Sequence, residues 1–227
     1  MEESFESLFE EFGSRILWGI VDQCVRRGLV DVEGLSDSEV VGTALLDFLK
    51  ETDANAAIVD GEVAWSDDDV HVLIDHSEGL LGKASEAMRA EEYWFAILFY
   101  ATWMEHWVNN ILMSLSVRSG IPEGVAVTLM RSCGFNLKIK DVWASLGATP
   151  IAKAHMRTMT DLMEFRNGFV HYKWQSRSMT DESARDQRVK EVAQSAQNLV
   201  TALESLEDQI IFFGRRNALR AQLGLTE

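Results

Sequence analysis

The sequence predicts an all-α protein, folded as a helical bundle with a small N-terminal appendage. Apolar residues recur at three- and four-residue steps over long stretches of the chain, which is the spacing of one face of an α-helix. Glycine and proline stand between these stretches, where they end one helix before the next begins. Apolar residues make up 47% of the 227 residues, which is enough for a full hydrophobic core.

After residue 70 the spacing predicts six helices. They are expected at about 71–90, 92–118, 122–132, 137–146, 151–166 and 184–214. The turns between them are marked by Gly120, Pro122, Gly134, Gly147 and Pro150. The last helix is the longest, and its regular apolar face predicts that it returns across the bundle.

The first 70 residues predict two further helices and a β-hairpin. One helix is expected over Phe5–Arg27 and a second over Ser36–Lys50, where Ser36 and Glu39 form a capping box at the start. The dipeptide Asp60-Gly61 predicts a two-residue hairpin turn within Ala56–Trp65. This set of elements resembles a small winged-helix appendage.

Negative charge is concentrated in this N-terminal part. Residues 1–70 hold 18 Asp or Glu against four Lys or Arg, whereas residues 71–227 are close to neutral. The acidic run Asp67–Asp69 is the predicted junction, so we expect an acidic N-terminal region at 1–70 and a helical domain at 71–227. The acidity argues against DNA binding by the first region, because phosphates repel it. It leaves open an adaptor or a nucleic-acid mimic as an alternative role.

Composition and familiar motifs bound the function. The only cysteines, Cys24 and Cys133, are far apart, which argues against a disulfide framework and favours a reducing cytoplasm. No signal peptide is recognisable, and the richest apolar run, Tyr93–Met104, is too short to span a bilayer. The histidines have no spacing typical of metal ligands, and we find no P-loop, dinucleotide fingerprint or nucleophile elbow. We therefore expect no metal and no cofactor.

The segment Arg166–His171 carries the most informative chemistry. Arg keeps its charge at any working pH and can direct two donors at phosphate oxygens, whereas His can take and give a proton near neutrality. Such a pair is suited to metal-free attack on a phosphodiester. A helix is predicted over Ile151–Phe165, with Arg166 at its end and Gly168 as its terminator, so that Asn167 lies near the C-cap. In one straight helix, Arg166 and His171 would point about 140° apart, so a break or a second subunit has to bring them together.

These residues resemble the motif of the HEPN family, all-helical domains that include many metal-independent ribonucleases of prokaryotic toxin and antiviral systems. The family motif is an Arg, a polar residue and a His four to six positions after the Arg, matched here by Arg166, Asn167 and His171. The family's long helices before and after the motif correspond to about residues 71–215, roughly two-thirds of the chain. The resemblance implies RNA cleavage in a composite cleft of a homodimer. Some such toxins carry a Tyr two residues after the His, where this chain has Lys173.

Further candidate residues surround the motif. Residues 131–190 hold 11 basic and six acidic residues, and we expect Tyr172, Lys173 and Arg177 to bind the RNA substrate. Other residues expected to line a track for the RNA backbone are Lys138, Lys140, Arg185 and Arg188, with Trp174 as a second stacking face. The alternative is that these are solvated helix faces and that Trp174 belongs to the core.

Glu105 is the acidic residue of an otherwise apolar helix, and two interpretations of it stay open. If it is buried it needs a cation, and Arg166 is the obvious candidate, which it would orient for catalysis. Otherwise it faces water on a polar stripe. The motif too has an alternative, in which Arg166 pairs with Glu164 or Asp161 and His171 caps a helix. The competing function is a non-catalytic HEPN-like scaffold that binds a partner protein, such as a cognate antitoxin, or a nucleotide.

Overall fold

The computed structural model describes residues 18–30, 32, 57–59, 62–64, 77–170 and 182–222. Most of these residues are helical, which confirms the predicted all-α class. The chain divides into two compact units, one formed by Asp75–Glu207 and the other by Met1–Ile74 together with Asp208–Glu227. The motif region lies in the first of these, which we call the motif unit.

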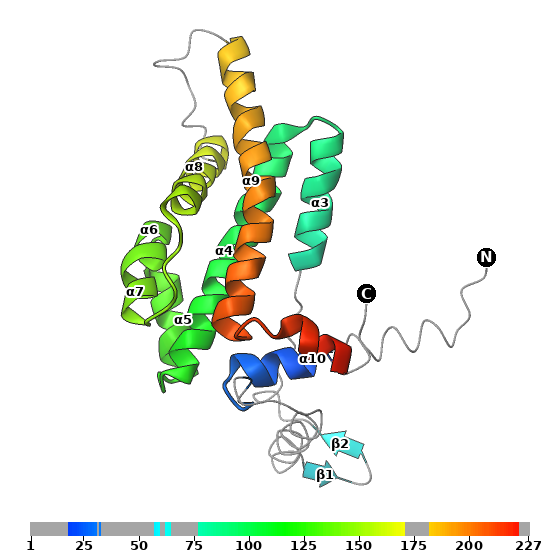
Figure 1. Ribbon diagram of the computed structural model, residues 1–227, viewed down its shortest axis with the longest axis vertical. Coiled ribbons are helices and arrows are strands. Elements are labelled where there is room, and N and C mark those ends of the chain that lie inside the picture. Colours follow the sequence, from blue (N-terminus) through cyan, green and yellow to red (C-terminus); the bar gives the residue numbers. More distant parts are fainter. Residues whose placement is uncertain are drawn as a thin grey trace, which may run out of the picture. The chain divides into compact units, whose positions relative to one another are not determined.

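The motif unit consists of long helices and one short helical run (Figure 1). The elements are α3 (Ser77–Arg89), α4 (Tyr93–Arg118), α5 (Glu123–Ser132), α6 (Phe135–Leu137), the π-helix η1 (Lys138–Val142), α7 (Trp143–Ser145), α8 (Lys153–Val170) and α9 (Glu182–Ile211). The helices expected at 92–118 and 122–132 are confirmed to within a residue or two. Helix α3 is described from Ser77 onwards, and residues 71–76 lie outside the described residues.

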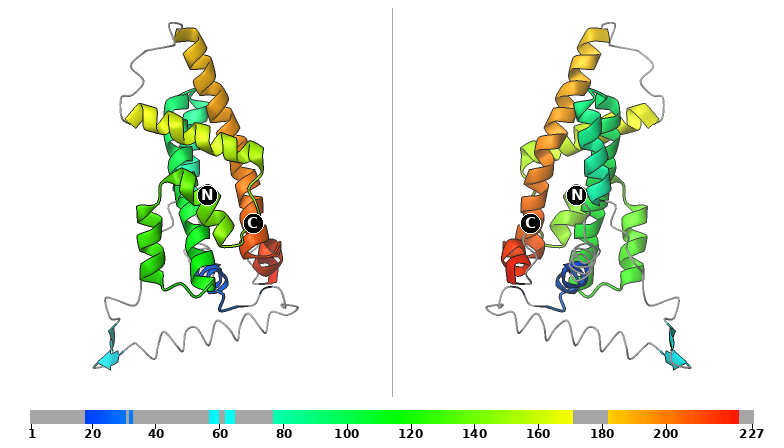
Figure 2. Two further views of the ribbon diagram at one scale, coloured as in Figure 1. Left: turned by 90° about the vertical axis from the view of Figure 1, so that its left-hand side faces the viewer. Right: turned by 90° about the vertical axis from the view of Figure 1, so that its right-hand side faces the viewer.

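Helix α4 is the centre of the motif unit. It packs against α3, α5, η1 and α8, and its sequence is apolar on almost every side. A helix that is apolar all round is one that is covered all round. Figure 2 shows α8 running across the long axes of α4 and α9. The core therefore follows α4, with Ile97, Met104, Ile111 and Leu112 fully buried along its length.

Two of the predicted glycine turns end helices by the same mechanism. Gly120 has a φ of 79° and Gly147 a φ of 68°, the left-handed region in which only glycine avoids strain. After α4, the amides of Gly120 and Ile121 donate to the carbonyls of Val117 and Ser116, which is the Schellman pattern. These turns confirm the predicted ends of the central helix and of the helical run 135–145.

Two details of the predicted helices were wrong. The helix expected at 137–146 begins at Phe135, and its middle, Lys138–Val142, is π-helical, a local widening that apolar spacing does not reveal. The break expected at Gly168 does not occur, because α8 continues to Val170. A helical glycine costs only about 1 kcal/mol relative to alanine. Packing offsets this cost, because Trp94 stacks on Phe169 and lies in a tilted arrangement against Phe165, on either side of Gly168.

The second unit is organised around Phe212, which is fully buried. Residues 18–26 are helical, and Trp18 of this helix stacks on Phe212 with ring centroids 5.9 Å apart. The Arg216 guanidinium lies 4.5 Å from the centroid of the Phe212 ring. Cys24 is also buried here, and burial raises the pKa of its thiol, although the nearby Arg27 acts in the opposite direction. The C-terminal segment therefore shares a core with the N-terminal helix.

This arrangement corrects the predicted end of the chain. The helix expected at 184–214 stops at Ile211, where Phe213 and Gly214 take positive φ values of 53° and 75° and turn the backbone. The amide of Gly214 donates to the carbonyl of Asp208, and a further helix, α10 (Arg216–Gln222), follows. The domain boundary differs accordingly, because residues 208–222 group with the N-terminal unit.

Strands β1 (Ala57–Val59) and β2 (Glu62–Ala64) pair antiparallel, with Ile58 opposite Val63. The predicted helix Ser36–Lys50, the turn Asp60-Gly61 and the junction Asp67–Asp69 lie outside the described residues, as does the start of the helix expected over Phe5–Arg27. The winged-helix-like appendage therefore stays a prediction.

The central place of α4 leads to a stability prediction. We expect Leu112→Ala to lower the free energy of unfolding by about 2–5 kcal/mol, because the side chain is fully buried and its deletion leaves a cavity. Urea denaturation followed by far-ultraviolet circular dichroism measures the change. Val125→Ala on α5 is the matched control, since Val125 is 56% exposed and its truncation is expected to change stability by less than about 0.5 kcal/mol. Equal effects of the two changes would contradict the central position of α4.

Candidate functional site

Arg166 lies in the last turns of α8 and is held by two side chains. Its Nη1 donates to Oδ1 of Asn167 at 2.9 Å, and its Nη2 lies 3.6 Å from Oε2 of Glu105 on α4. The predicted contact between Glu105 and Arg166 is therefore confirmed. The premise of burial is not, because the two side chains are 33% and 32% exposed.

This geometry bears on the alternative in which Arg166 pairs with Glu164 or Asp161. Asp161, one of the acidic residues considered as its surface partner, binds Arg188 of α9 instead, with Arg188 Nη2 at 3.2 Å from Asp161 Oδ2. An ion pair that is one-third exposed adds about 1 kcal/mol or less to stability, since water screens it. The main effect of the ion pair is to fix the orientation of the Arg166 guanidinium, because a planar group held at two nitrogens has few remaining orientations. Three of the four predicted catalytic and supporting residues, Arg166, Asn167 and Glu105, thus meet in one place, which we call the cationic site.

A second polar link lies one turn farther along α4. Nζ of Lys138 donates to Oδ1 of Asn109 at 2.8 Å, and Lys138 is only 5% exposed. Glu105 and Asn109 are four residues apart, so their side chains are neighbours on one face of α4. The expectation that Lys138 lines an exposed track for RNA is therefore wrong. The signal that was missed is the i, i+4 pair of polar residues on a helix that is otherwise apolar.

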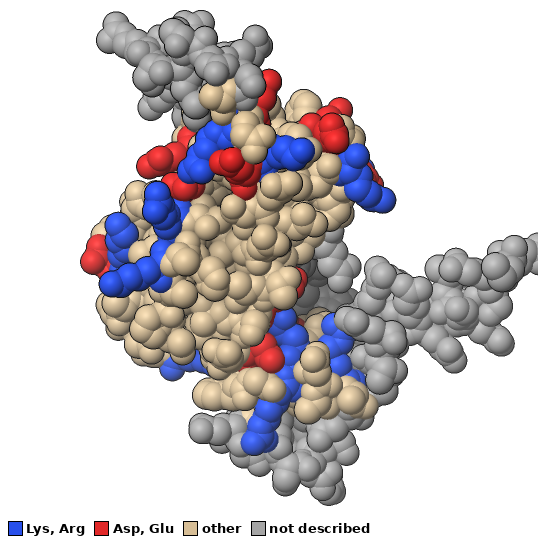
Figure 3. Space-filling view, turned by 45° about the horizontal axis from the view of Figure 1, so that its top comes forward, with Lys and Arg blue, Asp and Glu red and all other residues tan. Residues whose placement is uncertain are grey.

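The other predicted basic residues divide into exposed, paired and undescribed ones. Lys140 is exposed, whereas Arg188 pairs with Asp161 and Glu191, and Arg185 lies 3.8 Å from Asp186. Figure 3 shows basic and acidic side chains intermixed at the top of the view, with a broad uncharged area below them. The described surface in this view therefore carries no continuous basic track. His171, Tyr172, Lys173, Trp174 and Arg177 lie outside the described residues.

Aromatic side chains flank the motif on the outer side of α8. Trp94 stacks on Phe169, with ring centroids 5.5 Å apart, and lies in a tilted arrangement against Phe165, with ring centroids 6.0 Å apart. Phe165 is buried, but Phe169 is 40% exposed and Val170, at the end of the helix, is 47% exposed. The last turn of α8 thus presents an apolar surface beside Arg166 and immediately before His171.

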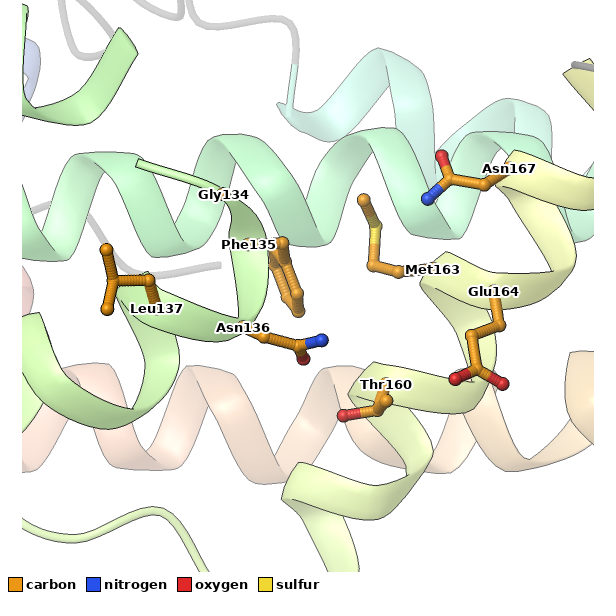
Figure 4. A pocket seen from close by; sticks show the side chains of 8 residues that line it. All are labelled: Gly134, Phe135, Asn136, Leu137, Thr160, Met163, Glu164 and Asn167. Carbon is orange, nitrogen blue, oxygen red and sulfur yellow. The ribbon is translucent and has the colours of Figure 1, made fainter. Parts of the chain in front are cut away.

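A pocket opens on the opposite side of Asn167. Its volume is about 240 Å³, and it lies between the start of α6 and one face of α8. Figure 4 shows Phe135 and Asn136 on one side of it and Thr160, Met163 and Glu164 on the other. The lining residues are Gly134, Phe135, Asn136, Leu137, Thr160, Met163, Glu164 and Asn167. Asn167 therefore contacts both the cationic site and the pocket.

Within the described ranges, no group of three His, Cys, Asp or Glu side chains comes together as metal ligands would. Of the helices in the part of the chain that the structure describes, none is both long and apolar enough to cross a membrane. Comparison of the chain with models of protein families, with curated proteins and with solved structures found no match. The function therefore has to be argued from the site itself.

The Lys138–Asn109 link predicts that replacing one partner changes stability more than replacing the other. We expect Asn109→Leu to lower the free energy of unfolding by about 1–3 kcal/mol, because it leaves a buried ammonium group without this acceptor. Lys138→Met is expected to be neutral or slightly stabilising, since it replaces the buried cation with an apolar chain of similar length. Chemical denaturation of the two variants measures the difference. A larger loss for Lys138→Met than for Asn109→Leu would show that the charge itself is stabilising.

Proposed function

We propose that this protein is a metal-independent endoribonuclease of the HEPN type, acting in the cytoplasm as part of a toxin–antitoxin or antiviral defence system. The observation that carries the proposal is the setting of Arg166. Its guanidinium is oriented by Glu105 and Asn167 yet remains about one-third exposed, so it is both positioned and accessible to a phosphate. His171, the proton-transfer residue of the motif, follows α8 directly after Val170.

The proposed reaction is an internal transfer at phosphorus. His171 takes the proton from the 2′-hydroxyl of RNA or gives a proton to the leaving 5′-oxygen. The 2′-oxygen forms a bond to phosphorus as the bond to the 5′-oxygen breaks, which leaves a 2′,3′-cyclic phosphate and a free 5′-hydroxyl. Arg166 stabilises the additional negative charge on the phosphorane, and Asn167 holds the phosphate or its neighbours. Glu105 is a positioning residue, since it acts through Arg166.

The unbroken α8 supports the proposal of a homodimer. Because the helix is unbroken through Val170, the route in which a break at Gly168 turns His171 towards Arg166 is closed. Both an acid and a base are needed, and one chain contributes a single His to the motif. A second copy of the chain supplies the other His in a composite cleft. The exposed Phe169 and Val170 beside the motif are consistent with such an interface.

The finer features of the fold belong to the same proposal. The helices α3, α4, α8 and α9 would form a HEPN-like bundle, and the acidic N-terminal region a winged-helix-like appendage. Tyr172, Lys173 and Arg177 would bind the RNA strand beyond the motif. One observation favours a non-catalytic scaffold as the second candidate: the charge of Arg166 is already compensated by Glu105, as in a purely structural ion pair.

Cleavage without metal is the central test. We expect the purified protein to cut mixed transfer and messenger RNA in the presence of EDTA, and to leave 2′,3′-cyclic phosphate ends. His171→Ala and Arg166→Ala should each lower the rate by about 100-fold or more, since general acid–base and oxyanion contributions are of that size. Glu105→Gln should lower the rate by about tenfold, because Arg166 loses one of its two anchors.

Arg157→Ala is the matched control for Arg166→Ala, because Arg157 lies on the same helix and is exposed. It should retain the wild-type rate, and circular dichroism should show that all variants are folded. Absence of cleavage by the wild type, or equal cleavage by all variants, would favour the scaffold.

The dimer is tested by dilution. We expect the rate per chain to fall when the protein is diluted below the dissociation constant of the dimer, measured in parallel by analytical ultracentrifugation. The reason is that a separated copy lacks the second His171. A fully active monomer would contradict the composite cleft, and the Arg157→Ala variant should follow the wild-type dilution curve.

A further inference from the structure

The pocket beside Asn167 has the size and lining of a site for one nucleobase. Its volume of about 240 Å³ lies below the roughly 300–1,000 Å³ typical of sites for larger ligands. Phe135, Leu137 and Met163 give it apolar walls, which suit the flat faces of a base. Polar side chains are interleaved with these walls, so hydrogen bonds can select among bases.

The polar groups of α8 that line the pocket lie on one face of the helix. Thr160, Glu164 and Asn167 are four and three residues apart, which stacks them along the same side. The start of α6 contributes Asn136 from the opposite wall (Figure 4). Three of these four polar side chains therefore belong to one face of α8, and their donors and acceptors can be assigned from the contacts around them.

Two neighbouring contacts determine which hydrogen bonds remain. Oδ1 of Asn167 accepts from Arg166, which leaves the Asn167 amino group to donate into the pocket. The Thr160 hydroxyl donates to the carbonyl of Met156 at 2.9 Å, so its oxygen remains as an acceptor. Glu164 is exposed and offers a carboxylate, which accepts only. The pocket thus presents a strong acceptor pair beside a fixed donor.

We propose that this pocket binds the guanine base of an RNA substrate, an inference that rests on the proposed ribonuclease function. Guanine presents two adjacent donors, N1–H and the exocyclic amino group, which a carboxylate can accept together. Its O6 is an acceptor next to them, placed to accept from the Asn167 amino group. Glu164 binds the two donors, and Asn167 binds O6.

The other bases match this pattern less well. Adenine and cytosine each present one amino donor beside a ring nitrogen that accepts, so the second carboxylate oxygen faces a lone pair. Uracil presents carbonyl oxygens on both sides of a single N–H, and Glu164 repels them. The same negative charge disfavours a phosphate in the pocket. We therefore expect the pocket to bind guanine most tightly and uracil most weakly.

Asn167 connects this pocket to the reaction. It accepts from Arg166 on one side and lines the pocket on the other, so a base bound there lies beside the phosphate that Arg166 binds. The pocket would then determine which phosphodiester is cut. Cleavage is expected next to guanosine, and Glu164 is a specificity-determining residue with no role in proton transfer.

Binding of mononucleotides tests the pocket without any cleavage. Guanosine, adenosine, cytidine and uridine 5′-monophosphates carry the same phosphate, so its contribution cancels when their affinities are compared by isothermal titration calorimetry with the full-length protein. We expect guanosine monophosphate to bind at least tenfold more tightly than uridine monophosphate. Glu164→Gln should weaken guanosine monophosphate by about tenfold or more, because hydrogen bonds to a charged acceptor are lost. It should change uridine monophosphate little.

Asp141→Asn is the matched control, since it removes one negative charge from an exposed carboxylate outside the pocket lining. It should preserve the preference for guanine. Equal binding of the four nucleotides, no measurable binding, or a preference that survives Glu164→Gln would overturn the proposal. The two hypotheses can be refuted separately. Selective binding of guanine without RNA cleavage would support the guanine pocket and refute the nuclease. RNA cleavage without a guanine preference would support the nuclease and refute the guanine pocket.

Discussion

The arrangement of the motif unit depends on two polar side chains of a buried helix. Glu105 and Asn109 lie one turn apart on α4, and they hold the cations of two different segments, Arg166 of α8 and Lys138 of η1. An apolar helix surface gives its neighbours freedom to slide, because hydrophobic contact is not directional. Hydrogen bonds and ion pairs are directional, so these links set the register of α8 and η1 against the same helix. The geometry of the pocket between α6 and α8 therefore depends on both links.

The same two links differ in what they leave available for chemistry. Lys138 is almost completely buried, so its link to Asn109 is structural and contributes to packing. Arg166 is one-third exposed, and the pairing with Glu105 leaves other guanidinium donors free to meet a phosphate. Partial exposure also keeps the pairing with Glu105 weak, so a phosphodiester, whose negative charge increases in the phosphorane, can compete for the same donors. A positioned yet weakly neutralised cation is what electrostatic catalysis requires.

The sequence predicted those features that depend on local patterns. Apolar spacing located the central helices, and Gly120 and Gly147 marked their ends, because positive φ is a local requirement. Prediction from the sequence failed where contacts with residues far away in the chain overrode a local preference. Gly168 is a weak helix former, but Trp94, more than 70 residues earlier in the chain, stacks across it and keeps α8 intact. The stop of α9 at Ile211 likewise depends on the burial of Phe212 against Trp18, which no window of local sequence contains.

For the candidate site, the sequence predicted which side chains meet better than it predicted how exposed or buried they are. Arg166, Asn167 and Glu105 do come together, as the lone carboxylate on an apolar helix suggested, although the pair is one-third exposed and not buried as that argument assumed. A similar argument applies to Lys138. Its charge predicted an exposed side chain, because Asn109 was not recognised as its partner. An amide is a less obvious partner than a carboxylate, yet it is sufficient for a buried ammonium group when the bond is 2.8 Å long. Counting amides as well as carboxylates on apolar helix faces would have located the Lys138–Asn109 link too.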